Sequence, residues 1–165
     1  MTPEEIRKRL IRHHVLAAWP EGALDALIEA CTLRTFHVGE ALWQRGEPGD
    51  AAFVLVSGRV ERALSVHPDG HRAEQLSEPG ALLSLSSLVQ AWEHTSSAVA
   101  LEQTEALELT RDTFQQLFDA SQPGAFALVD AIAENLVHDM RDVNRRLHQV
   151  FGQPAETLRL LRRVA

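Results

Sequence analysis

The sequence predicts an α+β fold in which antiparallel strands lie between short N-terminal helices and a long C-terminal helix. Two observations predict the strands: glycine-rich turns recur through the middle of the chain, and an unbroken apolar run, Phe53–Val56, lies between two of them. Such a run fits a strand that is covered on both faces. A third observation predicts the last helix. From Ala125 to Phe151 the chain has neither glycine nor proline, and its apolar residues recur every three or four positions.

Composition and charge narrow the class of protein. The 165 residues are 45% hydrophobic, which is ample for a core, and the formal net charge of −7 argues against broad electrostatic binding to nucleic acid. The N-terminus is too polar for a signal peptide, and no apolar run reaches the length of a membrane span. We therefore expect a cytoplasmic protein with no membrane partner.

Residues 1–31 are predicted to form two short helices. The segment Thr2–Glu5 combines a capping hydroxyl, a proline and two acidic residues, and apolar residues continue at helical spacing as far as Leu16. A second helix follows the break at Pro20. The adjacent pair His13-His14 lacks partners at ligand spacing along the chain, so no metal site is expected.

Residues 32–120 carry the predicted strands and the turns between them. Gly46–Asp50 is dense in residues that reverse a chain, and Asp69-Gly70 is a strong hairpin signal. The last strand is predicted to lead into a short helix capped by Thr110 or Asp112.

Residues 121–151 contain the predicted long helix, which would be about 40 Å long. Apolar residues follow one side of it at near-heptad spacing, and a domain of this size has no core long enough to cover them. We therefore expect a homodimer formed along this apolar seam, with a helix folded back on its own strands as the alternative. The seam consists of Val129, Ile132, Leu136, Met140, Val143, Leu147 and Val150.

The stretch from Gly39 to Gly58, with its glycines, its Glu47-Pro48-Gly49-Asp50 turn and its apolar run, resembles the first half of the cyclic nucleotide-binding domain. That domain senses cAMP or cGMP in bacterial regulators of the Crp/Fnr type, kinases and channels. The resemblance covers about residues 22–163. It implies an antiparallel β-roll, or double-stranded β-helix, with N-terminal helices and a long dimerisation helix. The alternative is an unrelated antiparallel barrel with glycine turns.

The resemblance also implies a phosphate-binding cassette after Gly80. In the family, a glutamate accepts a hydrogen bond from the ribose hydroxyl, and an arginine about nine residues later pairs with the cyclic phosphate. The corresponding residues here are Leu85 and His94, and Ser84 stands at the glycine of the motif. Leucine would leave the ribose hydroxyl unpaired, which costs about 1–3 kcal/mol, and histidine lacks the bidentate guanidinium. We therefore expect no cAMP or cGMP binding of the usual kind.

Serines cluster where the cassette helix is expected to start, and free N–H groups at a helix start favour an anion. They could hold a phosphate or another small polar ligand; alternatively, Ser84 caps the helix and the other serines only pack. The candidate ligand-binding residues are Ser84, Leu85, Ser86, Ser87, His94 and Thr95.

Together these features predict a non-catalytic regulatory sensor that signals from the cassette to the long helix and to a protein partner. No nucleophile with a base, carboxylate pair or His-x-His…Glu set indicates an enzyme, and no cofactor or metal is expected. Two alternatives remain open: the sensor half of a Crp/Fnr-type transcription regulator that binds a cyclic nucleotide or another small ligand, and a purely structural interaction dimer. The short basic tail, residues 152–165, cannot read DNA, so DNA binding would need a further domain beyond Ala165.

Overall fold

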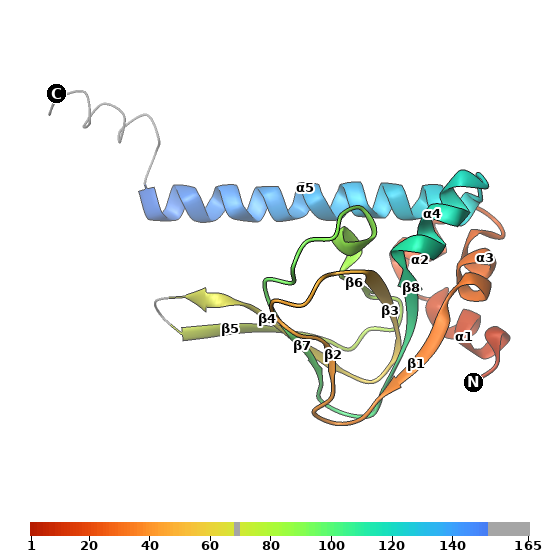
Figure 1. Ribbon diagram of the computed structural model, residues 1–165, viewed down its shortest axis with the longest axis horizontal. Coiled ribbons are helices and arrows are strands. Elements are labelled where there is room, and N and C mark those ends of the chain that lie inside the picture. The colour runs from red at the N-terminus through yellow and green to blue at the C-terminus, as the bar shows by residue number, and fades with distance from the viewer. Residues whose placement is uncertain (68–69, 152–165) are drawn as a thin grey trace, which may run out of the picture. The chain divides into compact units, whose positions relative to one another are not determined.

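The computed structural model of the chain describes residues 1–67 and 70–151. Its contacts divide the chain into two units, residues 1–129 and 130–165, so the boundary falls inside the long C-terminal helix. The first unit contains the N-terminal helices, the described strands and the start of the long helix (Figure 1). All the residues predicted to bind a ligand therefore lie in the first unit.

Three short helices, where the sequence predicts two, form within residues 1–31. They are α1 (Pro3–Leu10), α2 (His14–Ala17) and α3 (Ala23–Ala30). α1 begins with a capping box, in which the Thr2 hydroxyl accepts the N–H of Glu5 at 3.3 Å and the Glu5 carboxylate accepts the N–H of Thr2 at 2.7 Å. The prediction of one helix as far as Leu16 is wrong. The chain bends after α1, and this bend brings His13 and Leu16 against Gly80.

The described strands form two antiparallel sheets of four strands each. The first has the order β1-β8-β3-β6 and the second β2-β7-β4-β5, so most neighbouring strands are distant in sequence. β4 and β5 form the hairpin predicted around Gly70, and it extends past the other strands of its sheet (Figure 1). The strands are β1 (Thr32–Phe36), β2 (Ala41–Trp43), β3 (Ala51–Ser57), β4 (Val60–His67), β5 (Gly70–Leu76), β6 (Leu82–Leu83), β7 (Ala98–Ala100) and β8 (Thr104–Thr110). The predicted antiparallel β-roll with flanking helices is confirmed.

Strand β3 is buried on both faces, as its apolar run predicts. On one face, Ala51, Phe53 and Leu55 belong to the core cluster, which takes residues from both sheets and so lies between them. Trp43 stacks on Phe53 in this cluster with 5.9 Å between ring centroids. On the other face Val54 is also buried, and α1 contacts β3. The strand therefore links the core of the roll to the N-terminal helices.

Helix α4 (Arg111–Asp119) follows β8 directly. Its cap is Thr110, the first of the two predicted residues, because the Thr110 hydroxyl accepts the N–H of Thr113 at 3.2 Å. Phe114 is the buried residue of α4, and the helix contacts β8 and η1. This short helix thus continues the chain directly from β8 and packs beside it.

The long helix α5 spans Pro123–Phe151 and has 29 residues. It begins at Pro123 rather than at Ala125 as predicted, and Gly124 lies in its first turn. A glycine is required there because a Cβ would lie 2.8 Å from the carbonyl oxygen of Ala23 in α3. The start of α5 therefore packs closely on α3.

Candidate functional site

The cassette segment, residues 81–95, begins at a glycine turn that is hydrogen-bonded to β3. Gly80 has a φ of 97°, a conformation that favours glycine, and its N–H donates to the carbonyl oxygen of Leu55 at 2.7 Å. The N–H of Leu55 in turn donates to the carbonyl oxygen of Ala81 at 3.0 Å. β6 and the single-turn 3₁₀ helix η1 (Leu85–Leu88) follow. The short helix predicted here is present, as a 3₁₀ turn.

Three leucines of the cassette segment face the interior, whereas Val89 and Trp92 are exposed. Leu83 is 1% exposed, Leu85 is 5% exposed and Leu88 is 2% exposed. Leu85 is the residue at which the resemblance places a ribose-binding glutamate, and its side chain is part of the packed interior. Burial of this leucine stabilises the segment by about 1.5–3 kcal/mol relative to an exposed leucine.

The serines at the start of η1 differ from one another. Ser84 has a left-handed backbone, with a φ of 57°, and its side chain makes no capping hydrogen bond to the helix. Its hydroxyl instead lies 2.7 Å from the hydroxyl of Ser87, which is buried, and Ser86 is exposed. Ser84 thus occupies the N-cap position of η1 without the side-chain hydrogen bond that the packing alternative expected. Ser87 is buried, as that alternative expected, whereas Ser86 is exposed.

The Gly46–Asp50 turn lies in close contact with Ser87. A Cβ on Gly49 would collide with the Ser87 hydroxyl oxygen and would lie 3.1 Å from the carbonyl oxygen of Trp92. The N–H of Gly49 already donates to that Trp92 carbonyl at 2.8 Å. The glycine at this position thus permits a close approach between the turn and the cassette segment.

Arg111 joins the same two segments and was not among the predicted site residues. Its Nε donates to the carbonyl oxygen of Ser87 at 2.8 Å, and its Nη2 donates to the carbonyl oxygen of Gly49. Its backbone N–H also donates to the carbonyl oxygen of Asp50 at 2.7 Å. One sequence signal could have found it: an arginine is unfavourable in the first turn of a helix, where the macrodipole is positive, unless another contact compensates.

His94, which the resemblance places at the family arginine, stacks on an aromatic partner. Its ring stacks on the Trp43 ring with 5.1 Å between centroids, and its backbone exchanges hydrogen bonds with Glu47 and Gly46, both at 2.8 Å. Burial lowers the pKa of His94 below its ordinary value, although Glu47 and Asp50 act in the opposite direction. The ring is therefore mainly neutral at pH 7 and is a poor substitute for a guanidinium.

The predicted ligand site has two parts, the serines at the start of η1 and the residues around His94. The structure places both parts beside the Gly46–Asp50 turn. The Gly46–Asp50 turn contacts Ser87 and is hydrogen-bonded to Trp92 and His94. Thr95 follows and is exposed. The turn predicted as a scaffold feature is thus itself part of the candidate site.

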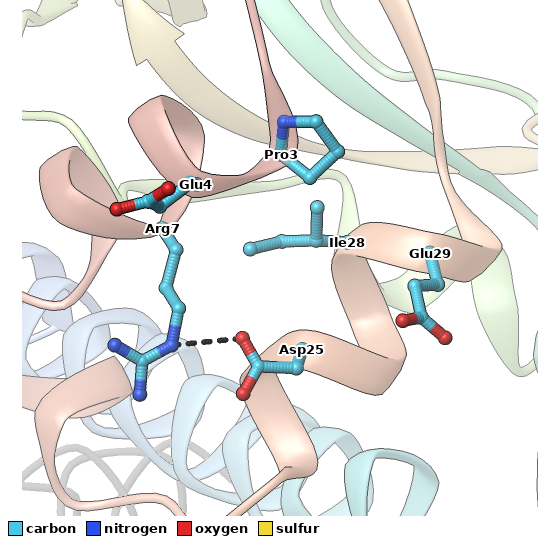
Figure 2. A pocket seen from close by; sticks show the side chains of 6 residues that line it. All are labelled: Pro3, Glu4, Arg7, Asp25, Ile28 and Glu29. Atoms are coloured by element: carbon cyan, nitrogen blue, oxygen red, sulfur yellow. Dashed lines mark ion pairs between the residues drawn. The ribbon is translucent and has the colours of Figure 1, made fainter.

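A separate pocket lies between α1 and α3, outside the predicted site (Figure 2). It has a volume of about 270 Å³ and is lined by Pro3, Glu4, Arg7, Asp25, Ile28 and Glu29. Its arginine is already paired, because Arg7 Nε lies 2.8 Å from Asp25 Oδ1 (Figure 2). The pocket therefore offers no free cationic group for an anionic ligand.

The apolar seam of α5 is described in part. Val129, Leu136 and Met140 are 39%, 43% and 71% exposed, and the nearby Val137 is 45% exposed. Ile132 is 5% exposed and so presents little surface to a partner. The side chains of the remaining seam residues lie outside the described part: Val143, Leu147 and Val150.

Searched over the described residues, the helices include none with the length and apolar character needed to cross a bilayer.

Comparison with known proteins assigns the family. The model of the cyclic nucleotide-binding domain matches residues 33–121, more than half of the chain, and this chain belongs to that family. A cyclic AMP receptor protein from Thermus thermophilus is 35% identical over 95 residues, which are 57% of this chain and 44% of the relative. The chain thus spans less than half the length of that relative.

Solved structures agree with the assignment. The catabolite activator protein of Thermus thermophilus matches with a TM-score of 0.66 and 26% identity, over 79% of this chain and 61% of the other. A cyclic nucleotide-binding domain from Methylobacillus flagellatus matches with a TM-score of 0.72 over 92% of this chain and 86% of the other, at 19% identity. The second likeness concerns the fold alone.

Proposed function

We propose that this chain is a non-catalytic regulatory sensor domain of the cyclic nucleotide-binding type. It works as a homodimer, and it lacks the side chains that usually bind the ribose and phosphate of cAMP and cGMP. Membership of the family and the 35% identical cyclic AMP receptor protein support a regulatory role. In the cassette segment, the hydroxyls of Ser84 and Ser87 bind each other rather than a base. This pairing does not resemble an activated nucleophile.

The observation that carries the proposal is the burial of Leu85 at the position of the ribose-binding glutamate. A leucine side chain accepts no hydrogen bond, and a ribose hydroxyl enclosed beside it would lose its partners in water. The penalty for such an unpaired group is about 1–3 kcal/mol. That penalty alone corresponds to about one or two decades of affinity.

The state of His94 supports the same proposal. An arginine would offer two parallel donors and a permanent charge to a cyclic phosphate. His94 is instead stacked on Trp43, and burial favours its neutral form. It therefore supplies at most a single neutral donor at pH 7.

Calorimetric titration of the full chain with cAMP and cGMP tests the proposal. We expect no heat of binding at micromolar ligand concentrations. The positive control is the variant that restores the family residues, Ser84→Gly, Leu85→Glu and His94→Arg, which should gain measurable cAMP binding if it melts cooperatively. A matched control, Ser86→Gly alone, should leave the wild-type result unchanged.

A second candidate is a sensor that does bind cAMP, and the name of the 35% identical relative favours it. Micromolar or tighter binding of cAMP by the wild-type chain would support this candidate and contradict the proposal. The exposed hydroxyls of Ser86 and Thr95 would then be the polar groups to substitute first.

The homodimer is proposed from the surface of α5. A helix of 29 residues with several exposed apolar side chains on one side is typical of a helix that pairs with a second copy of itself. The exposed part includes Leu136 and Met140. Burial of these side chains in a pair of helices would recover about 25 cal/mol for each Å² removed from water.

A further inference from the structure

Two adjacent histidines and a distant glutamate form a cluster outside the cassette segment. His13 is the residue before α2, His14 begins α2, and Glu78 lies in the turn between β5 and β6. One ligand-type atom from each residue lies within 4.8 Å of the other two. His13 Nε2 is 4.0 Å from Glu78 Oε2, and the two imidazole rings have centroids 4.7 Å apart. The sequence spacing of His13 and His14 could not indicate this third partner.

The position of His13 is fixed by Gly80. A Cβ on Gly80 would collide with the Cβ of His13, would lie 2.7 Å from its Cγ, and would lie 3.1 Å from a methyl carbon of Leu16. Gly80 also has a φ of 97°, so both its backbone and its contacts require glycine. The turn that carries Glu78 therefore lies directly against the His13 side chain.

His13 is a buried polar residue with an unpaired atom. The residue is 9% exposed, and its Nδ1 is buried with no hydrogen-bond partner among the described residues. A buried nitrogen in that state costs about 1–3 kcal/mol, so native structures rarely keep one without a reason. In a neutral imidazole one nitrogen carries the proton and the other has a lone pair that can bind a metal ion. Nε2, the nitrogen 4.0 Å from Glu78 Oε2, is the one placed to bind an ion shared with Glu78.

The donor set suits one class of ion. Two imidazole nitrogens and a carboxylate, with a fourth position open to water, are a common arrangement for Zn²⁺. Zinc bonds of 2.0–2.1 Å in tetrahedral geometry place ligand atoms about 3.3 Å apart. His14 and Glu78 are exposed, so rotation of their side chains can close the remaining gap.

We propose that His13, His14 and Glu78 form a site for a divalent transition-metal ion that favours imidazole ligands, with Zn²⁺ as the first choice. The ion would tie the junction of α1 and α2 to the turn that leads into the cassette segment. That turn is already anchored to β3, since Gly80 donates to the Leu55 carbonyl oxygen. The site does not depend on whether the cassette segment binds a nucleotide.

Calorimetric titration of the chelator-treated full chain with Zn²⁺ alone tests the site. We expect one ion per chain with a micromolar or tighter dissociation constant. The variants His14→Ala and Glu78→Gln should each weaken binding by about tenfold or more, since even outer partners of metal ligands contribute that much. Both residues are exposed, so neither substitution should unfold the apo chain. The matched control is His37→Ala, which removes an exposed histidine in a different turn and should leave binding unchanged.

A melting experiment gives an independent readout. Zn²⁺ should raise the melting temperature of the wild-type chain, because an ion that binds only the folded state stabilises it, and should do so much less for Glu78→Gln. Absence of Zn²⁺ binding by the wild-type chain overturns the proposal. So does one-to-one binding that is unaffected by His14→Ala and Glu78→Gln, since the ion would then be held elsewhere.

Discussion

Arg111, the first residue of α4, donates from Nε to the backbone carbonyl oxygen of Ser87, at 2.8 Å, and from Nη2 to the carbonyl oxygen of Gly49. One guanidinium thus connects the cassette segment, the Gly46–Asp50 turn and the helix that follows the roll. Because these carbonyl groups bond to a charged donor, each contact belongs to the stronger class of protein hydrogen bonds. Arg111 therefore links the turn to η1.

We expect Arg111→Ala to lower the free energy of unfolding by about 1.5–3 kcal/mol, the range for hydrogen bonds to charged groups. Arg111→Lys should recover only part of the loss, because an ammonium cannot reach two carbonyls with a fixed fork. Urea denaturation followed by tryptophan fluorescence measures both. The control is Gln116→Ala, an exposed position on the same helix, which should change stability by less than about 0.5 kcal/mol. Equal stability of Arg111→Ala and the control would show that the contacts to Ser87 and Gly49 contribute nothing.

Substitution of Gly49 and substitution of Gly46 should each lower the free energy of unfolding, for different reasons. Gly49→Ala adds a methyl group against Ser87, and overpacking of this kind costs about 1–3 kcal/mol. Ser87→Ala removes the colliding hydroxyl, so the double variant should be more stable than the sum of the single effects predicts, by at least about 0.5 kcal/mol. Gly46→Ala has open space but a φ of 87°, so its cost of about 1–2 kcal/mol is conformational.

Ser87→Ala should therefore not rescue Gly46→Ala, which serves as the matched control. Asparagine tolerates the left-handed region better than alanine, so Gly46→Asn should be milder than Gly46→Ala. Chemical denaturation of the four single variants and two double variants gives the cycles. Strict additivity in the Gly49–Ser87 pair would contradict the steric explanation.

His94 should make stability depend on pH. Burial lowers its pKa in the folded state, against the influence of Glu47 and Asp50, so between the folded pKa and the ordinary value of about 6.5 the unfolded chain binds the additional proton. Stability must then rise with pH across that window and fall as the pH drops below about 6.5. We expect His94→Gln to flatten this slope, measured as the melting temperature between pH 8 and pH 5. Parallel profiles for the two proteins would rule His94 out as a source of the slope.

The apolar seam of α5 should control the oligomeric state. We expect the wild-type chain to have the mass of a dimer in light scattering, and Leu136→Glu or Met140→Glu to shift it toward a monomer, because a buried carboxylate at a helix pair is costly. Asn135→Glu adds the same charge about 100° round the helix and is the matched control. A wild-type chain that is monomeric across a concentration series, or a dimer indifferent to both seam substitutions, would contradict the proposed interface.

The elements that local sequence encodes were predicted well. The buried strand β3, the hairpin around Gly70, the capping residue Thr110 and the long helix α5 all follow from patterns within a few residues of one another. The errors are informative as well. The break after α1 and the start of α5 differ from the prediction, and both lie beside residues from other parts of the chain: Gly80 is against His13, and Gly124 is against Ala23.

Some features of the candidate site could likewise be predicted from the sequence, and others could not. The strands and turns could be predicted from the sequence because strand period and turn chemistry are local properties. The resemblance to the cyclic nucleotide-binding domain implied the roll, and it marked Leu85 and His94 as the positions where a carboxylate and a guanidinium are missing. The hydrogen bond of Arg111 to Ser87 and the proximity of Glu78 to His13 became visible only in the folded chain. Such pairs form where the sheets and helices pack, and packing depends on side chains far apart in the chain, which a local pattern does not specify.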